Sequence, residues 1–239
     1  MIQLYPRDTR YRGDLGWLQS NASFSFGETF DEENSAFGPM RVCNDDVVAP
    51  RRGFGAHPHA DMEIVSLILS GQLRHEDNLG NVAVTGFGAV QRMSAGTGVV
   101  HTEANPSDTE PVNIIQMWFM PERRGMEPSY ETTVFDPEAM NGTLLPVVSR
   151  EGGTNVARIH QDMAIYLSRL ERGQSLEFAQ LAERRVFLFS FEGDVEVVNM
   201  RQPEERCVVR ERDTARIADA DRLSLTAVTP AFYMLIDLP

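Results

Sequence analysis

Short apolar runs that alternate with turn residues are the feature of this 239-residue chain that most constrains its fold. Residues 64–69 are apolar on both faces of an extended strand, which is typical of a strand buried inside a sandwich. Gly, Pro, Asn and Asp separate the runs, and many short strands between such turns favour an all-β sandwich or barrel. The clearest runs are 62–69, 112–119, 164–170, 186–191, 194–198, 223–228 and 232–238.

Helical patterning is weak throughout the sequence. No long amphipathic helix is indicated, and the best short candidate is the segment 136–140, which Asn141 and Gly142 would close. We therefore expect a chain made almost entirely of strands.

A weak internal repeat indicates two copies of one β domain. Residues 67–73 resemble residues 189–195, because in each an apolar strand enters a Gly turn and leaves on an apolar residue. The second copy begins 122 residues after the first (189 against 67), about half the length of the chain. The polar, proline-bracketed stretch 121–128 lies between the copies and is the expected crossing between domains.

The formal net charge of −13 limits the partners of the chain. Both halves are acidic, so phosphate backbones and anionic lipid surfaces repel them, and we expect no direct binding to nucleic acid or membrane. No run of about 18 apolar residues exists, so no transmembrane helix is predicted. The sequence starts without a secretory signal and has only two cysteines, which favours a cytoplasmic location with reduced thiols.

The histidines carry the strongest chemical signal. His57 and His59 lie two residues apart, and side chains at i and i+2 of a strand point to the same face. His101 and Glu103 repeat this spacing about 44 residues later. Two antiparallel strands with these pairs would offer three imidazoles and one carboxylate to a metal ion, a set that suits Fe(II), Mn, Co, Ni, Cu or Zn.

Spacing alone does not decide which carboxylate is the ligand. Glu63 lies four residues beyond His59, on the same face if the strand continues. It competes with Glu103 for the ligand position, and it could equally orient an imidazole. Gly-rich stretches precede both histidine pairs, at 53–56 and 94–98, and allow close approach of a backbone or a substrate.

The motifs HPHADME at residues 57–63 and GVVHTEAN at residues 98–105 resemble the paired motifs of the cupin superfamily. The closer resemblance is to pirin and the bacterial pirin-like bicupins. It covers most of residues 15–131 and is looser in the C-terminal half, at 173–178 and 237–239. The N-terminal segments that carry it are 41–46, 53–64, 77–81, 91–103, 105–107 and 128–131.

The resemblance implies an all-β bicupin, with two jelly-roll β-barrels in tandem. The N-terminal barrel would occupy residues 1–126 and hold the metal. The C-terminal barrel would occupy residues 127–239 without a metal, because the positions 122 residues beyond the first motifs carry no histidine. His160 has no partner in that half, so we expect it to be structural.

The ligands of the family match His57, His59, His101 and Glu103 in this sequence. The resemblance thus favours Glu103 as the carboxylate ligand. Glu63 would then orient a ligating side chain without binding the metal itself. One divalent transition metal is implied, with Fe(II) expected and Zn, Mn, Co, Ni or Cu as alternatives.

Some proteins of this family open the central ring of flavonols such as quercetin with O₂. The resemblance therefore implies a metal-dependent dioxygenase of the quercetin 2,3-dioxygenase type, whose partners are a small aromatic substrate and dioxygen. A carboxylate would take the proton of the flavonol 3-hydroxyl, Glu103 first and Glu63 as the alternative. Other members are regarded as non-enzymatic, metal-binding regulators that act through protein partners, and this is the alternative function.

Phe54, Met62 and Met93 are candidate walls of a substrate cavity, because they lie close to the motifs in sequence. Two positions depart from the family pattern: Ala22 and Asn113 stand where many members carry histidine. Neither is an expected metal ligand, but a change in the cavity wall would alter substrate preference.

Overall fold

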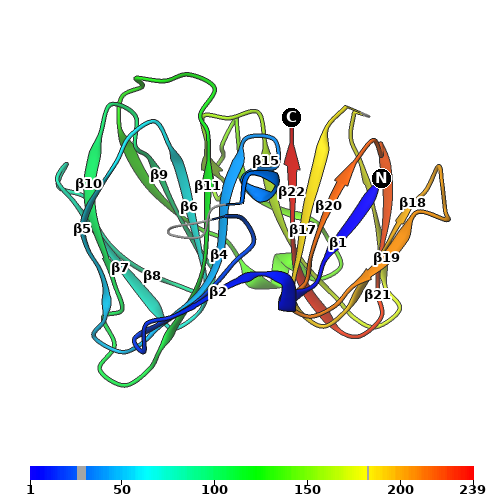
Figure 1. The fold of residues 1–239 in the computed structure, drawn as a ribbon, viewed down its shortest axis with the longest axis horizontal. Coiled ribbons are helices and arrows are strands. Elements are labelled where there is room, and N and C mark those ends of the chain that lie inside the picture. Colours follow the sequence, from blue (N-terminus) through cyan, green and yellow to red (C-terminus); the bar gives the residue numbers. More distant parts are fainter. Residues whose placement is uncertain (26–30, 182) are drawn as a thin grey trace. The chain divides into compact units, whose positions relative to one another are not determined.

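The computed structural model describes residues 1–25, 31–181 and 183–239, which are built almost entirely of β-strands (Figure 1). These residues divide into two compact units. The N-terminal unit comprises Tyr11–Phe135 and Arg150–Gln161, and the C-terminal unit comprises Met1–Arg10, Asp136–Ser149 and Asp162–Pro239.

Neither unit is continuous in sequence, in contrast to a simple division after residue 126. The first residues belong to the C-terminal unit, because β1 (Ile2–Tyr5) pairs antiparallel with β20 (Thr214–Ala218). Residues 150–161 return to the N-terminal unit, where the Arg158 backbone N–H donates to Glu131 Oε2 over 3.0 Å. Both arrangements depend on contacts between residues that are remote in sequence.

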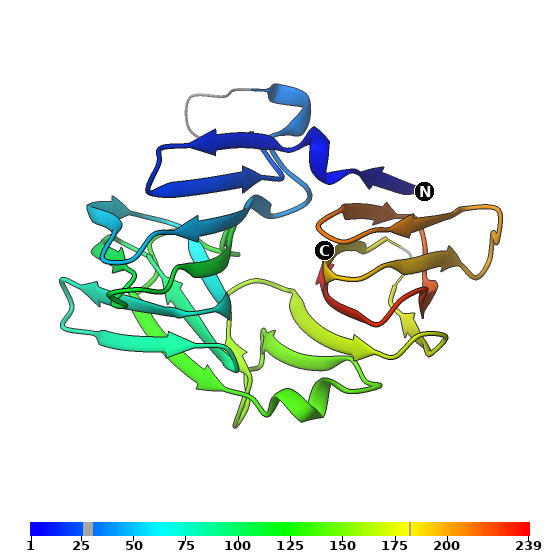
Figure 2. The same cartoon turned by 90° about the horizontal axis from the view of Figure 1, so that it is seen from below.

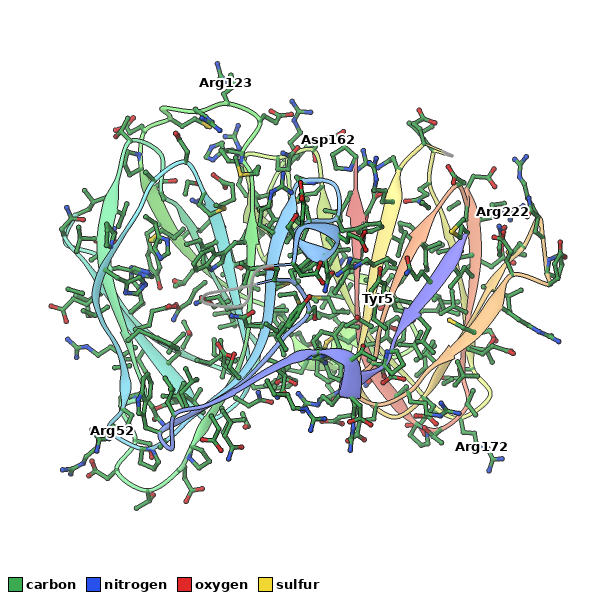
Figure 3. All side chains as sticks on the ribbon, viewed as in Figure 1. Tyr5, Arg52, Arg123, Asp162, Arg172 and Arg222 are labelled. Carbon is green, nitrogen blue, oxygen red and sulfur yellow. The ribbon has the colours of Figure 1, made fainter. Side chains whose placement is uncertain are left out.

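The stretch 121–128 is not the crossing between the units. It joins β11 to β12 inside the N-terminal unit, and Arg123 projects outward from it (Figure 3). The chain stays in this unit because β12 pairs with β9 along its whole length, from Ser129 opposite Ser94 to Val134 opposite Ala89.

Two antiparallel sheets make up the N-terminal unit within the described residues. One has seven strands in the order β12-β9-β6-β11-β4-β3-β2, and the other has four in the order β5-β10-β7-β8. Figure 2 shows β2 and β3 side by side as a hairpin. The strands are β2 (Tyr11–Asp14), β3 (Leu18–Ala22), β4 (Met40–Val48), β5 (Gly53–His59), β6 (Glu63–Ser70), β7 (Gln72–Asp77), β8 (Val82–Gly86), β9 (Ala89–Ser94), β10 (Val99–Ala104), β11 (Val112–Phe119) and β12 (Ser129–Val134).

Burial follows the sequence pattern in these strands. Residues 63–68 of β6 are buried on both faces, as their continuous apolar run predicts. In β7, by contrast, Leu73, His75 and Asp77 are buried while the residues between them are exposed. This period of two aims every second side chain of β7 into the barrel.

The two glycine turns that indicated an internal repeat have equivalent surroundings. Gly71, between β6 and β7, has a φ of +75°, and a Cβ there would lie 2.5 Å from the carbonyl oxygen of Pro111. Gly193, 122 residues later, has a φ of +67°, and its Cβ would lie 2.0 Å from the carbonyl oxygen of Pro230. Only glycine fits a left-handed turn this close to another backbone.

The C-terminal unit also consists of antiparallel strands, around an apolar interior. Strands β1-β20-β17-β22-β15-β13 lie side by side in this order, and β16-β21-β18-β19 form a second sheet. Leu188, Leu225 and Tyr233 are among the fully buried residues of this core. The strands not yet given are β13 (Leu145–Ser149), β15 (Ala164–Leu170), β16 (Ser175–Ala179), β17 (Arg185–Glu192), β18 (Val195–Asn199), β19 (Arg206–Val209), β21 (Arg222–Ala227) and β22 (Ala231–Leu238).

Helical structure is limited to short 3₁₀ turns in the described residues. The candidate at 136–140 is one of them: the turn η3 spans Pro137–Met140, and the Asp136 side chain accepts a hydrogen bond from the Glu138 N–H. The turns η1 (Arg7–Thr9) and η2 (Glu32–Asn34) and the short strand β14 (Ala157–Arg158) complete the elements.

Candidate metal centre

Strands β5 and β10 bring the two histidine motifs together. His57 lies directly opposite His101 in the antiparallel ladder, and His59 lies opposite Val99. The ring centroids are 4.9 Å apart for His57 and His59, 4.4 Å for His57 and His101, and 5.0 Å for His59 and His101. One nitrogen of each ring lies within 4.8 Å of one nitrogen of the other two rings, as the i, i+2 spacing predicted.

The three imidazoles have nitrogen lone pairs to offer. His57 Nδ1 lies 2.7 Å from the Gly55 carbonyl oxygen, so it carries the proton and leaves Nε2 as the acceptor. Burial, with the charge of His57, lowers the pKa of His59 to about 4 and that of His101 to about 3, so both rings are neutral at pH 7. His101 Nε2 is buried and has no hydrogen-bond partner among the described residues. A buried nitrogen without a partner beside two other imidazoles fits a divalent transition metal.

Glu103 lies on β10 beside this cluster, opposite an extra residue in β5. The pairing of β10 with β5 shifts between His101 and Glu103. The Glu103 carboxylate is buried, and its oxygens accept from Gln116 Nε2 over 3.0 and 2.8 Å. It groups within 4.8 Å with His101 and His75, rather than with all three motif histidines. Burial raises the pKa of Glu103, against the opposing effect of the Gln116 hydrogen bonds.

Glu63 is engaged elsewhere. Its carboxylate accepts from the Ser94 hydroxyl over 2.9 Å and from the His160 backbone N–H over 3.1 Å, and the His160 ring nitrogen lies 3.6 Å away. It belongs to neither histidine group found among the described residues. In this position Glu63 fastens residues 150–161 to the N-terminal unit.

His75 is a fourth histidine of the site that sequence reasoning missed. It lies on β7, is 1% exposed, and its Nδ1 is 3.3 Å from His101 Nδ1. Its ring stacks on Tyr130 with a centroid distance of 4.0 Å and an interplanar angle of 11°. The available signal was the same i, i+2 pattern, because His75 and Asp77 are separated by one residue in the sequence HED.

A row of polar side chains crosses the inner face of the seven-stranded sheet, opposite the histidines. Gln116 reaches Glu103 on β10, and Gln91 donates to Thr85 on β8, so the row points toward the four-stranded sheet. Asn44 is buried, and its Oδ1 has no hydrogen-bond partner in the part of the chain that the structure describes. The polar row consists of four residues that are cross-strand neighbours in this order: Asn44, Gln116, Ser66 and Gln91. Ala22 lies opposite Asn44 and ends the row.

The two departures from the family pattern lie on opposite faces of this sheet. Ala22 is directly opposite Asn44 and therefore belongs to the inner row. Asn113 is opposite Val47 and donates to Asp45 Oδ1 over 2.9 Å, on the other face. Only the change at position 22 is thus placed to alter the interior of the barrel.

The expected wall residues occupy different places. Met93 lines a small internal space together with His75, His101, Glu103 and Tyr130. Met62 packs against the cluster of Ile64, Met93 and Val99. Phe54 packs against a second apolar cluster, of Val48, Ile68, Leu73, Val112 and Ile114, with its ring 5.6 Å from that of Trp17.

Two cupin domains, one of which holds a cluster of histidines and a buried glutamate, define a bicupin. Residues 6–119 match the family model described as Pirin, and residues 146–238 match the model described as Quercetinase C-terminal cupin domain. The chain belongs to the pirin family.

Relatives and solved structures agree with this membership over the full length. The chain is 37% identical to quercetin 2,3-dioxygenase of Escherichia coli (strain K12), over 100% of this chain and 99% of that protein. It is 34% identical to a pirin-like protein of Caulobacter vibrioides, over 99% of each. The crystal structure of the bacterial pirin YhhW of Escherichia coli in complex with nickel(II) superimposes with a TM-score of 0.91 at 35% identity, covering 100% of this chain and 99% of that one. Among the described residues, no helix has the length and apolarity needed to span a membrane.

Proposed function

We propose that this protein is a metal-dependent dioxygenase of the quercetin 2,3-dioxygenase type, which opens a flavonol ring with O₂. The observation that carries the proposal is the grouping of the His57, His59 and His101 imidazoles, with the Glu103 carboxylate grouped with His101 and with a buried His101 Nε2 that has no hydrogen-bond partner among the described residues. The relative named quercetin 2,3-dioxygenase, at 37% identity, supports the choice of reaction.

His57, His59 and His101 would hold the metal, with Glu103 as the fourth ligand. A bound divalent ion, for which Fe(II) is our first choice, would act as a Lewis acid and lower the pKa of a coordinated hydroxyl group. The solved structure of YhhW in complex with nickel(II), at 35% identity to this chain, supports a divalent transition metal as the bound ion.

Glu103 is the best placed base for the flavonol 3-hydroxyl. A carboxylate whose pKa is raised by burial holds an abstracted proton more readily than an exposed one. Gln116 fixes both of its oxygens, so the carboxylate is oriented before the substrate arrives. Glu63 is committed to Ser94 and His160 and is the weaker candidate for this role.

The barrel interior would shield the reacting ring from water. Ile64, Met93 and Val99 form a buried apolar cluster in this barrel, and Trp118 packs against it and touches the His59 ring at a centroid distance of 4.8 Å. Exclusion of water strengthens electrostatic interactions within a site and limits side reactions of an activated substrate.

The test is oxygen uptake with quercetin by apoprotein reloaded separately with Fe(II), Mn(II), Co(II), Ni(II) or Cu(II). His101→Ala should abolish turnover, whereas His160→Ala, which removes a histidine outside the cluster, should retain it. Stoichiometric metal binding without turnover by any loaded form would overturn the proposal. That result would favour the alternative, a metal-binding regulator that acts through protein partners.

A further inference from the structure

A chain of hydrogen bonds runs away from the metal cluster behind His101. His101 Nδ1 lies 3.3 Å from His75 Nδ1, and His75 Nε2 lies 3.1 Å from Asp77 Oδ2. All three residues are buried, with 2%, 1% and 9% of their surface exposed. Solvent therefore does not compete for these contacts.

Asp77 acts in this chain as an acceptor. Its Oδ1 accepts from the backbone N–H groups of Leu79 and Asn81, each over 3.0 Å, and both oxygens accept from Asn81 Nδ2 over 3.1 and 2.9 Å. An ionised carboxylate has no proton to donate. The ring nitrogen that faces it, His75 Nε2, must therefore carry the hydrogen.

The position of one proton then fixes the next. A neutral imidazole carries a hydrogen on one nitrogen only, so His75 Nδ1 is an acceptor once its Nε2 is the donor. The hydrogen between the two rings must then belong to His101 Nδ1. The lone pair of His101 Nε2 is then free, and this is the buried nitrogen that has no hydrogen-bond partner within the described part of the chain.

Tyr130 keeps the middle ring of the chain in place. It comes from β12 of the opposite sheet and stacks on His75 almost face to face. The turn that follows β7 fixes the far end of the chain, because Asp77 binds the backbone of residues 79 and 81. Neither His75 nor Asp77 can therefore move without breaking several contacts.

We propose that His75 and Asp77 are positioning residues of the metal centre, which hold His101 in the tautomer that presents Nε2 to the metal. The proposal rests on the metal centre proposed above, but not on the identity of the substrate. Residues that orient a ligating histidine in this way typically change metal affinity by about 10- to 100-fold when they are removed.

The tautomer can be read directly in the metal-free protein. Two-bond ¹H–¹⁵N correlation spectra of histidine-labelled protein distinguish a protonated ring nitrogen from a bare one. We expect His101 to be protonated at Nδ1 and His75 at Nε2. A wild-type His101 that carries its proton on Nε2 would overturn the proposal without any mutation.

Asp77→Asn provides a sharper test, because it should reverse the donor and acceptor roles in the hydrogen bonds between residue 77, His75 and His101. The carbonyl oxygen of the introduced side-chain amide would keep the place of Oδ1 and its donors from residues 79 and 81, so the amide NH₂ would face His75. His75 would then accept at Nε2 and donate at Nδ1, and His101 would move its proton to Nε2. We expect this shift in the spectrum and a fall in Ni²⁺ affinity of at least about tenfold by titration calorimetry.

His75→Phe removes both ring nitrogens and keeps the stack on Tyr130, with His160→Phe as the matched control. We expect the Ni²⁺ affinity to fall about 10- to 100-fold in His75→Phe and to be unchanged in the control. Unchanged affinity and an unchanged His101 tautomer in both His75→Phe and Asp77→Asn would overturn the proposal. Failure of the dioxygenase assay would not affect these readouts, so the two proposals can fail separately.

Discussion

Gln116 donates through one side-chain amide nitrogen to both carboxylate oxygens of Glu103, over 3.0 and 2.8 Å. The same side chain accepts from Trp118 Nε1 over 3.1 Å, and the Trp118 ring touches His59. Gln116 therefore links the buried carboxylate on β10 to a histidine on β5 by a route separate from the strand pairing. Its amide partly offsets the cost of burying the negative charge of Glu103.

Gln116→Leu should weaken metal binding in a pH-dependent way. Without its donor the pKa of Glu103 rises further, and the carboxyl group is protonated over a wider pH range. A lost hydrogen bond to a charged group costs about 1.5–3 kcal/mol, which corresponds to roughly a tenfold or greater loss of affinity. We expect the loss of Ni²⁺ affinity to be larger at about pH 6 than at about pH 8.5, measured by titration calorimetry.

The control is Gln91→Leu, which removes an amide from the same inner row. The amide of Gln91 donates to Thr85 and to the Leu73 carbonyl oxygen, whereas that of Gln116 donates to Glu103. Gln91→Leu should lower the free energy of unfolding but leave the pH dependence of the Ni²⁺ affinity as in the wild type. Equal effects of both substitutions on metal binding would contradict the assignment of Gln116 as the partner of Glu103.

Substitutions of Glu63 and Glu103 should have opposite effects, the first on the free energy of unfolding and the second on Ni²⁺ affinity. Glu63→Ala leaves the His160 backbone N–H without its acceptor, at a cost of about 1–3 kcal/mol for a buried unsatisfied group, and it removes the hydrogen bond from the Ser94 hydroxyl, which also lies 3.0 Å from His160 Nδ1. We expect a lower free energy of unfolding in urea and nearly unchanged Ni²⁺ affinity. Glu103→Gln should give the reverse, with most of the metal affinity lost. Equal and severe metal loss in both variants would restore Glu63 as a ligand candidate.

The fold class and the histidine cluster could be predicted because they depend on local patterns. The i, i+2 rule placed His57 and His59 on one face, and a second strand with the same spacing brought in His101. Short apolar runs and glycine turns likewise indicated an all-β chain, which the structure confirms.

Features that depend on remote contacts were out of reach. The hydrogen bonds from Gln116 to Glu103 join two different sheets, and the extra residue in β5 opposite Glu103 depends on how two strands pair, which no spacing reveals. The return of residues 150–161 is fixed by Glu63 and Glu131, both far away in sequence. His75 was missed although His75 and Asp77 repeat the spacing of His101 and Glu103, and burial at every second residue of β7 aims His75 at His101.

Asp46 should make stability fall as the pH rises. It is 6% exposed on β4, its Oδ1 has no hydrogen-bond partner among residues 1–25, 31–181 and 183–239, and the hydroxyl of Ser20 donates to its carboxylate. Burial, with the nearby charges of Asp45 and Glu103, raises the pKa of Asp46 from 3.8 to about 7. The folded state thus holds a proton that the unfolded state releases, so this contribution to stability is present below about pH 4 and lost as the pH rises through about 7.

Asp46→Asn removes this titration and should stabilise the protein at high pH. A shift of about three pKa units corresponds to at most about 4 kcal/mol, so the variant should gain up to this amount at about pH 8 relative to its effect at about pH 4. Urea unfolding of metal-free protein at both pH values measures the difference. Asp14→Asn, an exposed aspartate on β2, is the control and should show none. A pH-independent effect of Asp46→Asn would show that the carboxyl group is ionised throughout.

Asn44→Leu should trade function for stability, because the amide is buried in the inner row without a partner for Oδ1. A buried acceptor without a donor costs about 1–3 kcal/mol, so an apolar side chain of similar size should leave the free energy of unfolding unchanged or raise it by about 1 kcal/mol. A polar side chain at position 44, beside Gln116, is explained if a hydroxyl group of a ligand donates to Asn44 Oδ1. We therefore expect quercetin to bind Zn²⁺-loaded Asn44→Leu about tenfold more weakly than wild type, measured by quenching of tryptophan fluorescence.

Two controls test whether this expectation is specific to the ligand hydroxyl group and to Asn44: the ligand flavone and the variant Asn113→Leu. Flavone has no hydroxyl group to donate, so its affinity should be the same for Asn44→Leu and wild type. Asn113→Leu removes an amide from the other face of the sheet and the hydrogen bond to Asp45, and should lower stability by about 1 kcal/mol without changing quercetin binding. A loss of stability in Asn44→Leu with unchanged quercetin affinity would instead show that the amide serves the fold and that the ligand lies elsewhere in the barrel.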